Sequence, residues 1–280
     1  MAEIVGGFIV PHAPMYLTMH DTVVSGQKEN CDRAFAATVE RLRMLEADTV
    51  ILIGDDHYTL FGPDCIPSIL IGAGDVDGPV EPWLGAQREQ IMTNEPLANH
   101  ILQYGLDHGI DWAVAKALTV DHSIFVPWYY VVKRAPGVRT IPVYLNSGVA
   151  PLIRNQRCLQ IGESIAAAVA EWKGQERVVV FASGGGAHWP GLGRWNDLNA
   201  EWDREILQMV EQGDVAGLVA LTDDEIFKVG GNGGWELKNW ICMMGALGHC
   251  RGITYTYEAV PELLGAFAYV HMQKSLVGLP

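Results

Sequence analysis

Five side chains with groups useful for catalysis stand just past predicted strands or at the start of predicted helices. They are His12, His57, His122, His188 and Glu236. In an open α/β sheet, ligands bind beyond the carboxyl ends of the strands. If the strands are neighbours in one sheet, we therefore expect these five side chains to converge on one edge of it.

Imidazole and carboxylate groups gathered at one edge predict a metal site. Two histidines and one carboxylate on a single face, with other positions open, form the ligand set of non-haem Fe(II) oxygenases. A hydrolytic zinc site could use the same ligands, and the residues alone leave both open. Further histidines beside the metal would act as acid–base groups near neutral pH. The chain contains neither His-Glu-x-x-His nor Gly-x-Ser-x-Gly, two motifs typical of hydrolases.

Each of these residues also has a plain structural interpretation. Gly54-Asp55-Asp56 is favourable turn sequence, and Asp121 could simply cap the helix that follows it. Glu236 could face a helix dipole, although the rest of its helix is apolar and a carboxylate buried there needs a partner. The functional interpretation is favoured because a strand followed by a histidine recurs along the chain.

The spacing of apolar residues predicts the elements that position these side chains. Short β-branched runs predict strands over 4–10, 50–57, 66–71, 139–145, 177–182 and 254–260. Amphipathic periodicity predicts helices over 29–46, 86–108, 124–133, 156–172, 196–210 and 235–247. A loop is predicted over 74–85, and 265–280 has no clear pattern. We expect an α/β fold, a single domain over 1–280 with a central mixed sheet flanked by helices.

Composition limits the partners that this chain can have. Of its 280 residues, 49% are hydrophobic, yet no apolar run approaches the length of a membrane helix. The net charge of −14 argues against nucleic acid and anionic membranes as partners. The five cysteines are scattered, no Cys-x-x-Cys occurs, and the start lacks a signal-peptide pattern. We expect a cytoplasmic protein with reduced thiols and neither nucleic-acid nor membrane partners.

Five segments carry a resemblance to a known family. They are Pro11-His12-Ala13-Pro14, Gly54-Asp55-Asp56-His57, Val120-Asp121-His122 with Val126-Pro127, Gly184-Gly185-Gly186-Ala187-His188, and Gly234-Trp235-Glu236-Leu237 with Trp240 and Met244-Gly245-Ala246-Leu247. In this order the segments resemble class III extradiol ring-cleavage dioxygenases, the family of the catalytic β subunit of protocatechuate 4,5-dioxygenase. Each segment alone is weak, but together they are specific and span nearly the whole chain.

The resemblance implies an Fe(II) enzyme that opens an aromatic ring by inserting both atoms of O2. It implies three groups of residues: metal ligands His12, His57 and Glu236; catalytic residues His188 and His122; and substrate-binding or supporting residues Asp56, Asp121 and Trp189. The implied partners are a small aromatic substrate and O2. We also expect a homo-oligomer, and the resemblance leaves room for a separate small helical subunit that this chain does not itself contain.

The segment Pro261–Ala266 bears on the expected substrate. Where protocatechuate-type enzymes have small polar residues that hold a carboxylate, this chain has Glu262 and two leucines. We expect a catechol, aminophenol or hydroxypyridone ring with no carboxylate directed there, because a buried carboxylate needs paired donors. The expected apolar pocket uses aromatic residues at Phe125, Trp128, Tyr129 and Trp189. The alternative is recognition by Arg194 or by a partner subunit.

Two competing functions remain open at this point. A metal-dependent hydrolase could use the same edge of the sheet, and oxygen consumption would separate it from a dioxygenase. A non-catalytic interaction protein of the same fold is the other alternative. Loss of a metal ligand would be its signature, but all three candidate ligands are present.

Overall fold

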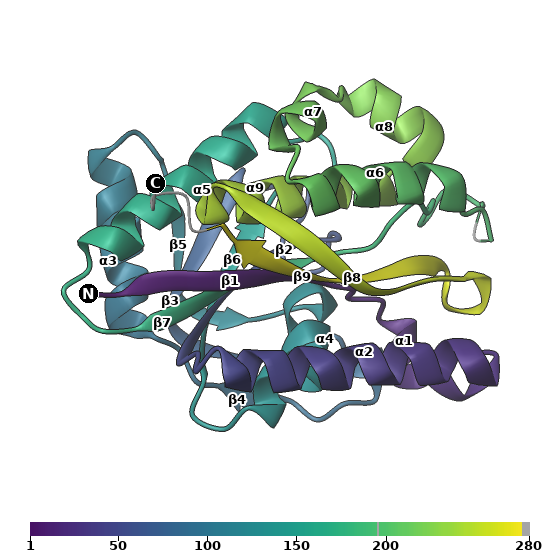
Figure 1. The fold of residues 1–280 in the computed structure, drawn as a ribbon, viewed down its shortest axis with the longest axis horizontal. Coiled ribbons are helices and arrows are strands. Elements are labelled where there is room, and N and C mark those ends of the chain that lie inside the picture. The colour runs from purple at the N-terminus through teal and green to yellow at the C-terminus, as the bar shows by residue number, and fades with distance from the viewer. Residues whose placement is uncertain (195, 276–280) are drawn as a thin grey trace.

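The computed structural model describes residues 1–194 and 196–275, apart from the side chain of His20. Within this part of the chain, one mixed sheet of nine strands runs through the centre and helices cover both of its faces (Figure 1). The predicted fold class, a single α/β domain with a mixed sheet, is therefore confirmed. Of the helices in the described ranges, none has both the length and the apolar composition needed to cross a bilayer.

The centre of the sheet is parallel. Its four strands are, in order across the sheet, β6 (Arg139–Leu145), β2 (Thr49–Asp55), β7 (Arg177–Ser183) and β1 (Glu3–Val10). Their carboxyl ends are level, since Val10 pairs with Ser183 and Asp55 pairs with Leu145. The loops that follow these strands therefore begin at the same edge of the sheet.

Antiparallel strands flank this centre on both sides. On one side β3 (Ile69–Gly78) pairs with β6, and β3 also pairs with β4 (Glu89–Ile91) and β5 (Ala113–Thr119). On the other side β9 (Gly265–Lys274) pairs with β1 and with β8 (Cys250–Val260). The loop predicted over 74–85 is wrong in its first part, because β3 continues to Gly78. There Asp75 is exposed while Val76 is buried, so acids and glycines occupy a half-exposed strand. Residues 276–280 lie outside the described part.

Helices form a layer on each face of the sheet (Figure 1). One layer contains α3 (Glu95–Asp107), α5 (Asn155–Glu171), α6 (Ala200–Gln212), α7 (Val215–Ala220), α8 (Asp223–Gly230) and α9 (Leu237–Leu247). The other contains α1 (Met15–Thr18), α2 (Ser25–Met44) and α4 (His122–Tyr130). The helix predicted over 86–108 starts only at Glu95, because β4 occupies its first residues. The short helices α7 and α8 were not predicted.

Strand β2 shows why the sequence folds this way. Alternate side chains of a strand point to opposite faces, and here both faces are covered. Ile51 and Ile53 pack in the core beneath α5 and α9, whereas Val50 and Leu52 pack in the core beneath α2 and α4. An uninterrupted apolar run therefore forms a buried strand, and the first acid after it, Asp55, is buried as well.

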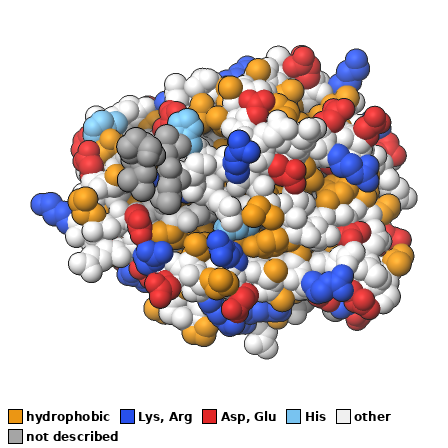
Figure 2. Space-filling model, viewed as in Figure 1, with side chains coloured by type: hydrophobic (Ala, Val, Ile, Leu, Met, Phe, Trp, Pro, Cys, Tyr) orange, Lys and Arg blue, Asp and Glu red, His pale blue; other side chains and the backbone are white. Residues whose placement is uncertain are grey.

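The surface is mixed in charge despite the net charge of −14. On the face drawn in Figure 2, Lys and Arg side chains are interspersed with Asp and Glu side chains, with apolar side chains between them. No continuous basic area covers this face of the described chain.

Candidate active site

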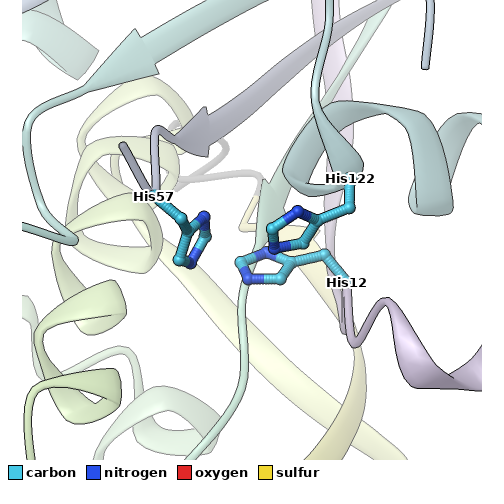
Figure 3. A group of neighbouring side chains, drawn as sticks. All are labelled: His12, His57 and His122. Atoms are coloured by element: carbon cyan, nitrogen blue, oxygen red, sulfur yellow. The ribbon is translucent and has the colours of Figure 1, made fainter. Parts of the chain in front are cut away.

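Three histidines from separate parts of the chain point toward one another at the carboxyl edge of the parallel strands (Figure 3). His12 follows β1, His57 follows β2, and His122 is the first residue of α4. The ring centroid of His12 lies 5.1 Å from that of His57 and 5.4 Å from that of His122. The ring centroids of His57 and His122 are 4.5 Å apart. The level ends of β1 and β2 thus bring together His12 and His57, which are far apart in the sequence, and the start of α4 adds His122.

Glu236 lies at the centre of the histidines. Its Oε1 is 3.4 Å from Nε2 of His12, 3.4 Å from Nε2 of His57 and 3.6 Å from Nε2 of His188. The side chain is 1% exposed. Glu236 ends the 3₁₀ turn Gly233–Glu236 and precedes α9, instead of standing in the first turn of a helix that begins at Trp235. Burial raises the pKa of Glu236, but the neighbouring histidines more than offset this and hold its pKa well below the usual value.

Hydrogen bonds fix which ring nitrogen of each histidine is free. The Ser183 hydroxyl donates to the backbone carbonyl of Ser123 (2.5 Å), so it accepts from Nδ1–H of His12 (2.7 Å). The Nδ1–H of His188 donates to the carbonyl of Gly186 (2.9 Å), which can only accept. Whenever these rings are neutral, Nε2 therefore keeps its lone pair, and in both rings Nε2 faces Glu236.

His57 is surrounded by carboxylates. Its Nδ1 is 3.6 Å from Oδ2 of Asp121, and its Nε2 is 3.4 Å from Oδ2 of Asp55. Burial lowers the pKa of His57, but Asp55, Asp121 and Glu236 together raise it well above the usual value. The same surroundings lower the pKa of Asp121 to about 2 although burial opposes this, whereas burial raises that of Asp55 to about 6 against the effect of His57.

His122 is held by Glu81, a residue of the predicted loop. One carboxylate oxygen of Glu81 accepts from Nδ1 of His122 and the other from its backbone N–H, both at 2.6 Å. Both side chains are buried. Burial and the nearby His57 lower the pKa of His122, so the ring is neutral with its proton on Nδ1 and its Nε2 free.

The donor atoms fit one first-row metal ion. Two ligands bound to one ion at about 2.1 Å, roughly 100° apart, are separated by about 3.2 Å, close to the 3.4 Å of the two His–Glu pairs. Among the described residues, two overlapping groups could hold an ion, His12–His57–His122 and His12–Asp55–His57–Glu236. Within the same residues, Asp55 Oδ2 and His57 Nδ1 are buried without a hydrogen bond. A cation beside Asp55 would satisfy its carboxylate.

The loops that carry His188 and Glu236 are joined by hydrogen bonds. The N–H of His188 donates to the carbonyl of Gly230 (3.0 Å), and the N–H of Gly233 donates to the carbonyl of His188 (3.1 Å). Gly185 N–H donates to Oε2 of Glu236 (2.7 Å). A Cβ on Gly233 would overlap with the His188 ring, so glycine is required for this approach.

A cavity of about 600 Å³ opens over these side chains. His12, His57, His122, His188 and Glu236 all line it. Among the described residues, its aromatic lining comes from Tyr58, Trp83 and Phe267. The expectation that Phe125, Trp128 and Tyr129 supply this lining is wrong, because all three belong to α4 and pack in or against the core on the α2 side.

The remaining expected residues lie around the site. The Asp56 carboxylate accepts from the backbone N–H groups of Thr59, Leu60 and Phe61 and so shapes the turn after His57. Asp121 caps α4 by accepting from Ser123 N–H, in addition to facing His57. Trp189 is buried beneath the Arg194 guanidinium at 4.3 Å and does not itself line the cavity, although its neighbour Pro190 does.

The segment Pro261–Ala266, expected to disfavour a substrate carboxylate, contributes its two leucines but not its acid to the cavity. Leu263 and Leu264 line the cavity. Glu262 is exposed and lies outside the lining, so its expected electrostatic role is wrong. In the 3₁₀ turn Pro261–Leu263 the acid faces solvent while Leu263 is buried.

Sequence reasoning placed Asp55 beside the expected site without a specific role, and it gave no role to Glu81, Ser183 and Asn239. Asn239 of α9 donates to Oδ1 of Asp55 (2.7 Å) and to the carbonyl of Ser183 (3.0 Å), which ties two strand ends to the helix after Glu236. An Asn among the apolar residues of α9 was the one signal that could have been noticed. Glu81 gave no signal, because only the three-dimensional path of the loop brings it to His122.

Comparison with known proteins identifies the family. A family model described as the catalytic LigB subunit of aromatic ring-opening dioxygenase matches residues 6–268. The chain is similar to 2,3-dihydroxyphenylpropionate/2,3-dihydroxicinnamic acid 1,2-dioxygenases from Burkholderia vietnamiensis (strain G4 / LMG 22486), with 25% identity over 87% of this chain and 90% of that protein, and from Rhodococcus rhodochrous, with 26% identity over 94% and 96%. A solved structure of the uncharacterized protein JW3007 from Escherichia coli K12 covers 97% of this chain and 100% of its own at a TM-score of 0.54; at 11% identity it shows the fold alone.

The family match covers most of the chain and every candidate residue described above. It favours ring cleavage over both the hydrolase and the non-catalytic alternatives. The chain belongs to the LigB family of catalytic subunits of aromatic ring-opening dioxygenases, and it is an extradiol ring-cleaving dioxygenase that acts on an aromatic substrate with O2.

Proposed function

We propose that this extradiol dioxygenase depends on Fe(II) held by His12, His57 and Glu236. The observation that carries the proposal is the position of Glu236 Oε1, 3.4 Å from Nε2 of each of the two histidines. Two imidazoles and one carboxylate are the ligand set that leaves open positions on Fe(II). Bound Fe(II) would supply the redox chemistry with O2, and the surrounding residues would orient the substrate and move its protons.

His188 is proposed as the acid–base group. Its Nδ1–H is held by the Gly186 carbonyl, so the lone pair on Nε2 is available to a substrate hydroxyl in the cavity. The ring can accept a proton there and return it to the product. His122, held by Glu81, presents Nε2 from another side of the cavity and would position the substrate. Asp121 would support His57 through Nδ1, as carboxylates do for metal-bound histidines.

The proposed substrates are aromatic rings with two adjacent hydroxyls, or with a hydroxyl beside an amine or ring nitrogen, as in catechols, aminophenols and hydroxypyridones. Three protein ligands would leave room for both adjacent groups of such a ring. A cytoplasmic homo-oligomer, working with or without a small helical subunit, also remains a proposal. Light scattering of the purified chain would give its oligomeric state, and full turnover by the chain alone would argue against a required subunit.

Iron content tests the proposed ligands. Wild type and the variants His12→Ala, His57→Ala and Glu236→Gln would be loaded with Fe(II) without oxygen, desalted, and assayed for bound iron. We expect near-complete loss in each variant with unchanged circular dichroism. His249→Ala, which removes an exposed histidine, is the control and should keep wild-type iron. A ligand variant that retains full iron would remove that residue from the proposal.

Oxygen uptake and product absorbance test the role of His188. We expect His188→Ala to bind iron and substrate normally but to turn over about 10²–10⁴-fold more slowly, the usual contribution of a positioned acid–base group. Wild-type kcat across the pH range would show that His188 is structural. Zinc, which has no redox chemistry, should occupy the same site without supporting oxygen uptake.

A further inference from the structure

The cavity is lined by both polar and apolar side chains. The polar ones include the histidines and Glu236 described above. The apolar ones, here called the apolar wall, include Pro14, Met15, Val80, Trp83, Leu264 and Phe267. A single aromatic ring would fill only part of about 600 Å³, a volume in the range of sites for larger ligands. The space beside the ring is therefore bounded mainly by apolar side chains.

No Lys or Arg lines this cavity among the residues that the structure describes. Positions 195 and 276–280, which it does not describe, contain none either. Arg194 is already engaged, because its Nε is 2.5 Å from Oδ2 of Asp197 and its guanidinium lies over Trp189. The two acids of the lining, Glu81 and Glu236, would repel a further negative charge.

Several residues around the cavity cannot donate a backbone N–H to a ligand. Four of the lining residues, Pro11, Pro14, Pro82 and Pro190, have no N–H to donate. The N–H groups of His122 and Gly185 already donate to Glu81 and Glu236. The hydroxyls of Tyr58 and Thr59 are neutral side-chain donors of the lining, and neither carries a positive charge.

We propose that the substrate is a diol ring with an uncharged, apolar substituent that packs on the wall around Trp83, Leu264 and Phe267, and that rings with an anionic substituent are disfavoured. This inference rests on the proposed function. A carboxylate at the wall would lose hydration without gaining a Lys or Arg partner. Tyr58 and Trp83, both 52% exposed, offer apolar surface that such a substituent would cover. The named relatives act on a ring with a propionate group, so this chain would differ from them.

Matched pairs of substrates test the proposal on Fe(II)-loaded protein. One pair is 3-propylcatechol and 2,3-dihydroxyphenylpropionate, and the other is 4-propylcatechol and 3,4-dihydroxyphenylpropionate, so that each pair differs in the carboxylate. Dissociation constants would be measured without oxygen by tryptophan fluorescence, and kcat/KM by oxygen uptake. We expect the propyl compound of the better-used pair to bind more tightly and to have a kcat/KM at least about tenfold higher.

The outcomes separate the two proposals. No oxygen uptake by the iron-loaded protein with any of the four diols, with 2-aminophenol or with a hydroxypyridone would overturn the proposed function. Uptake with equal or better use of the carboxylated compound would overturn the substrate class alone. Should Arg194→Gln abolish such a preference, recognition by Arg194 would replace the present proposal.

A variant of the apolar wall gives an independent test. Leu264→Lys would place a cation beside the proposed substituent, and Leu264→Met is the control of similar length without charge. We expect the lysine variant alone to shift the ratio of kcat/KM values toward the carboxylated compound by about tenfold or more. A folded lysine variant with the wild-type ratio and wild-type dissociation constants would show that the substituent does not reach this wall.

Discussion

Replacing Glu81 by Gln should invert the tautomer of His122 while keeping the volume of the side chain. In the wild type both carboxylate oxygens accept, one from Nδ1–H and one from the backbone N–H of His122, each at 2.6 Å. A glutamine has only one acceptor oxygen. The backbone N–H can only donate, so it takes that oxygen, and the amide NH2 then faces Nδ1. The imidazole can adapt by moving its proton from Nδ1 to Nε2.

The expected size of the effect comes from these two bonds. Loss of one charge-assisted bond and weakening of the other should lower the free energy of unfolding by about 1.5–3 kcal/mol. The proton would now lie on the nitrogen that faces the substrate, so we expect kcat/KM to fall by about 10²-fold, at the lower end of acid–base contributions. Metal affinity should change little, because the proposed ligands are untouched.

Nitrogen NMR of histidine-labelled, metal-free protein would report the tautomer directly. We expect the protonated nitrogen of His122 to change from Nδ1 to Nε2 in Glu81→Gln. Glu262→Gln, which alters an exposed acid outside the cavity, is the matched control and should behave as wild type. A glutamine variant that keeps the Nδ1–H tautomer and wild-type kcat/KM would refute the reasoning.

Three further predictions follow from contacts around the site and the sheet. Gly233→Ala should push the His188 ring away, since the new Cβ would overlap with it, and should lower kcat at least about tenfold with iron content unchanged; normal kcat would contradict the assigned contact. Ser183→Ala should weaken Fe(II) binding about 10–100-fold in a metal titration, because it removes the acceptor that orients His12; unchanged affinity would mean that the hydroxyl is dispensable. His271, buried and stacked on Phe8, has its pKa lowered to about 4 by burial and by Arg41. As pH falls from about 6.5 to 4, the unfolded chain therefore takes up a proton at His271 while the folded chain does not, and this lowers the free energy of unfolding. In His271→Phe the free energy of unfolding should therefore decrease less between about pH 6.5 and 4, by up to about 3 kcal/mol. Urea titrations at several pH values would measure it, and a wild-type pH dependence of the unfolding free energy would reject the prediction.

The parallel centre of the fold could be predicted because each strand is buried on both faces. The run Val50–Ile53 is apolar throughout, and the strand predicted over 139–145 has the observed bounds of β6. Flanking strands were harder, since a half-exposed strand contains polar residues that also suit loops. Asp75 and Asp77 in β3 are of this kind. The β9 strand ends in polar residues. It pairs with β8 just before it, but its other partner is β1 at the far end of the chain, so its place in the sheet depends on a long-range contact.

The candidate site was predictable only as far as its residues follow strands. His12, His57 and His188 carry that signal, and the structure brings them around Glu236. The two aspartates before His57 could not be told apart in this way. Asp55 still belongs to β2 and points toward His57, whereas Asp56 turns to backbone N–H groups of the next loop. The side to which each aspartate points depends on the residue at which the strand ends. If the strand ended one residue earlier or later, the predicted directions of the two side chains would be exchanged.

The hydrogen bonds between the loops of His188 and Glu236 have a consequence for how this enzyme can diversify. Because these loops are bound to each other, the proposed proton-transfer group and metal ligand form one unit with its own hydrogen bonds. A further bond, from Gly186 N–H to the Ala266 carbonyl (3.1 Å), ties this unit to the segment that carries Leu264. Trp83 comes from a different segment of the apolar wall, the connection after β3. Substitutions there can alter which ring is admitted while the reacting groups keep their geometry. Substrate range and chemical step can therefore change separately within one sequence lineage.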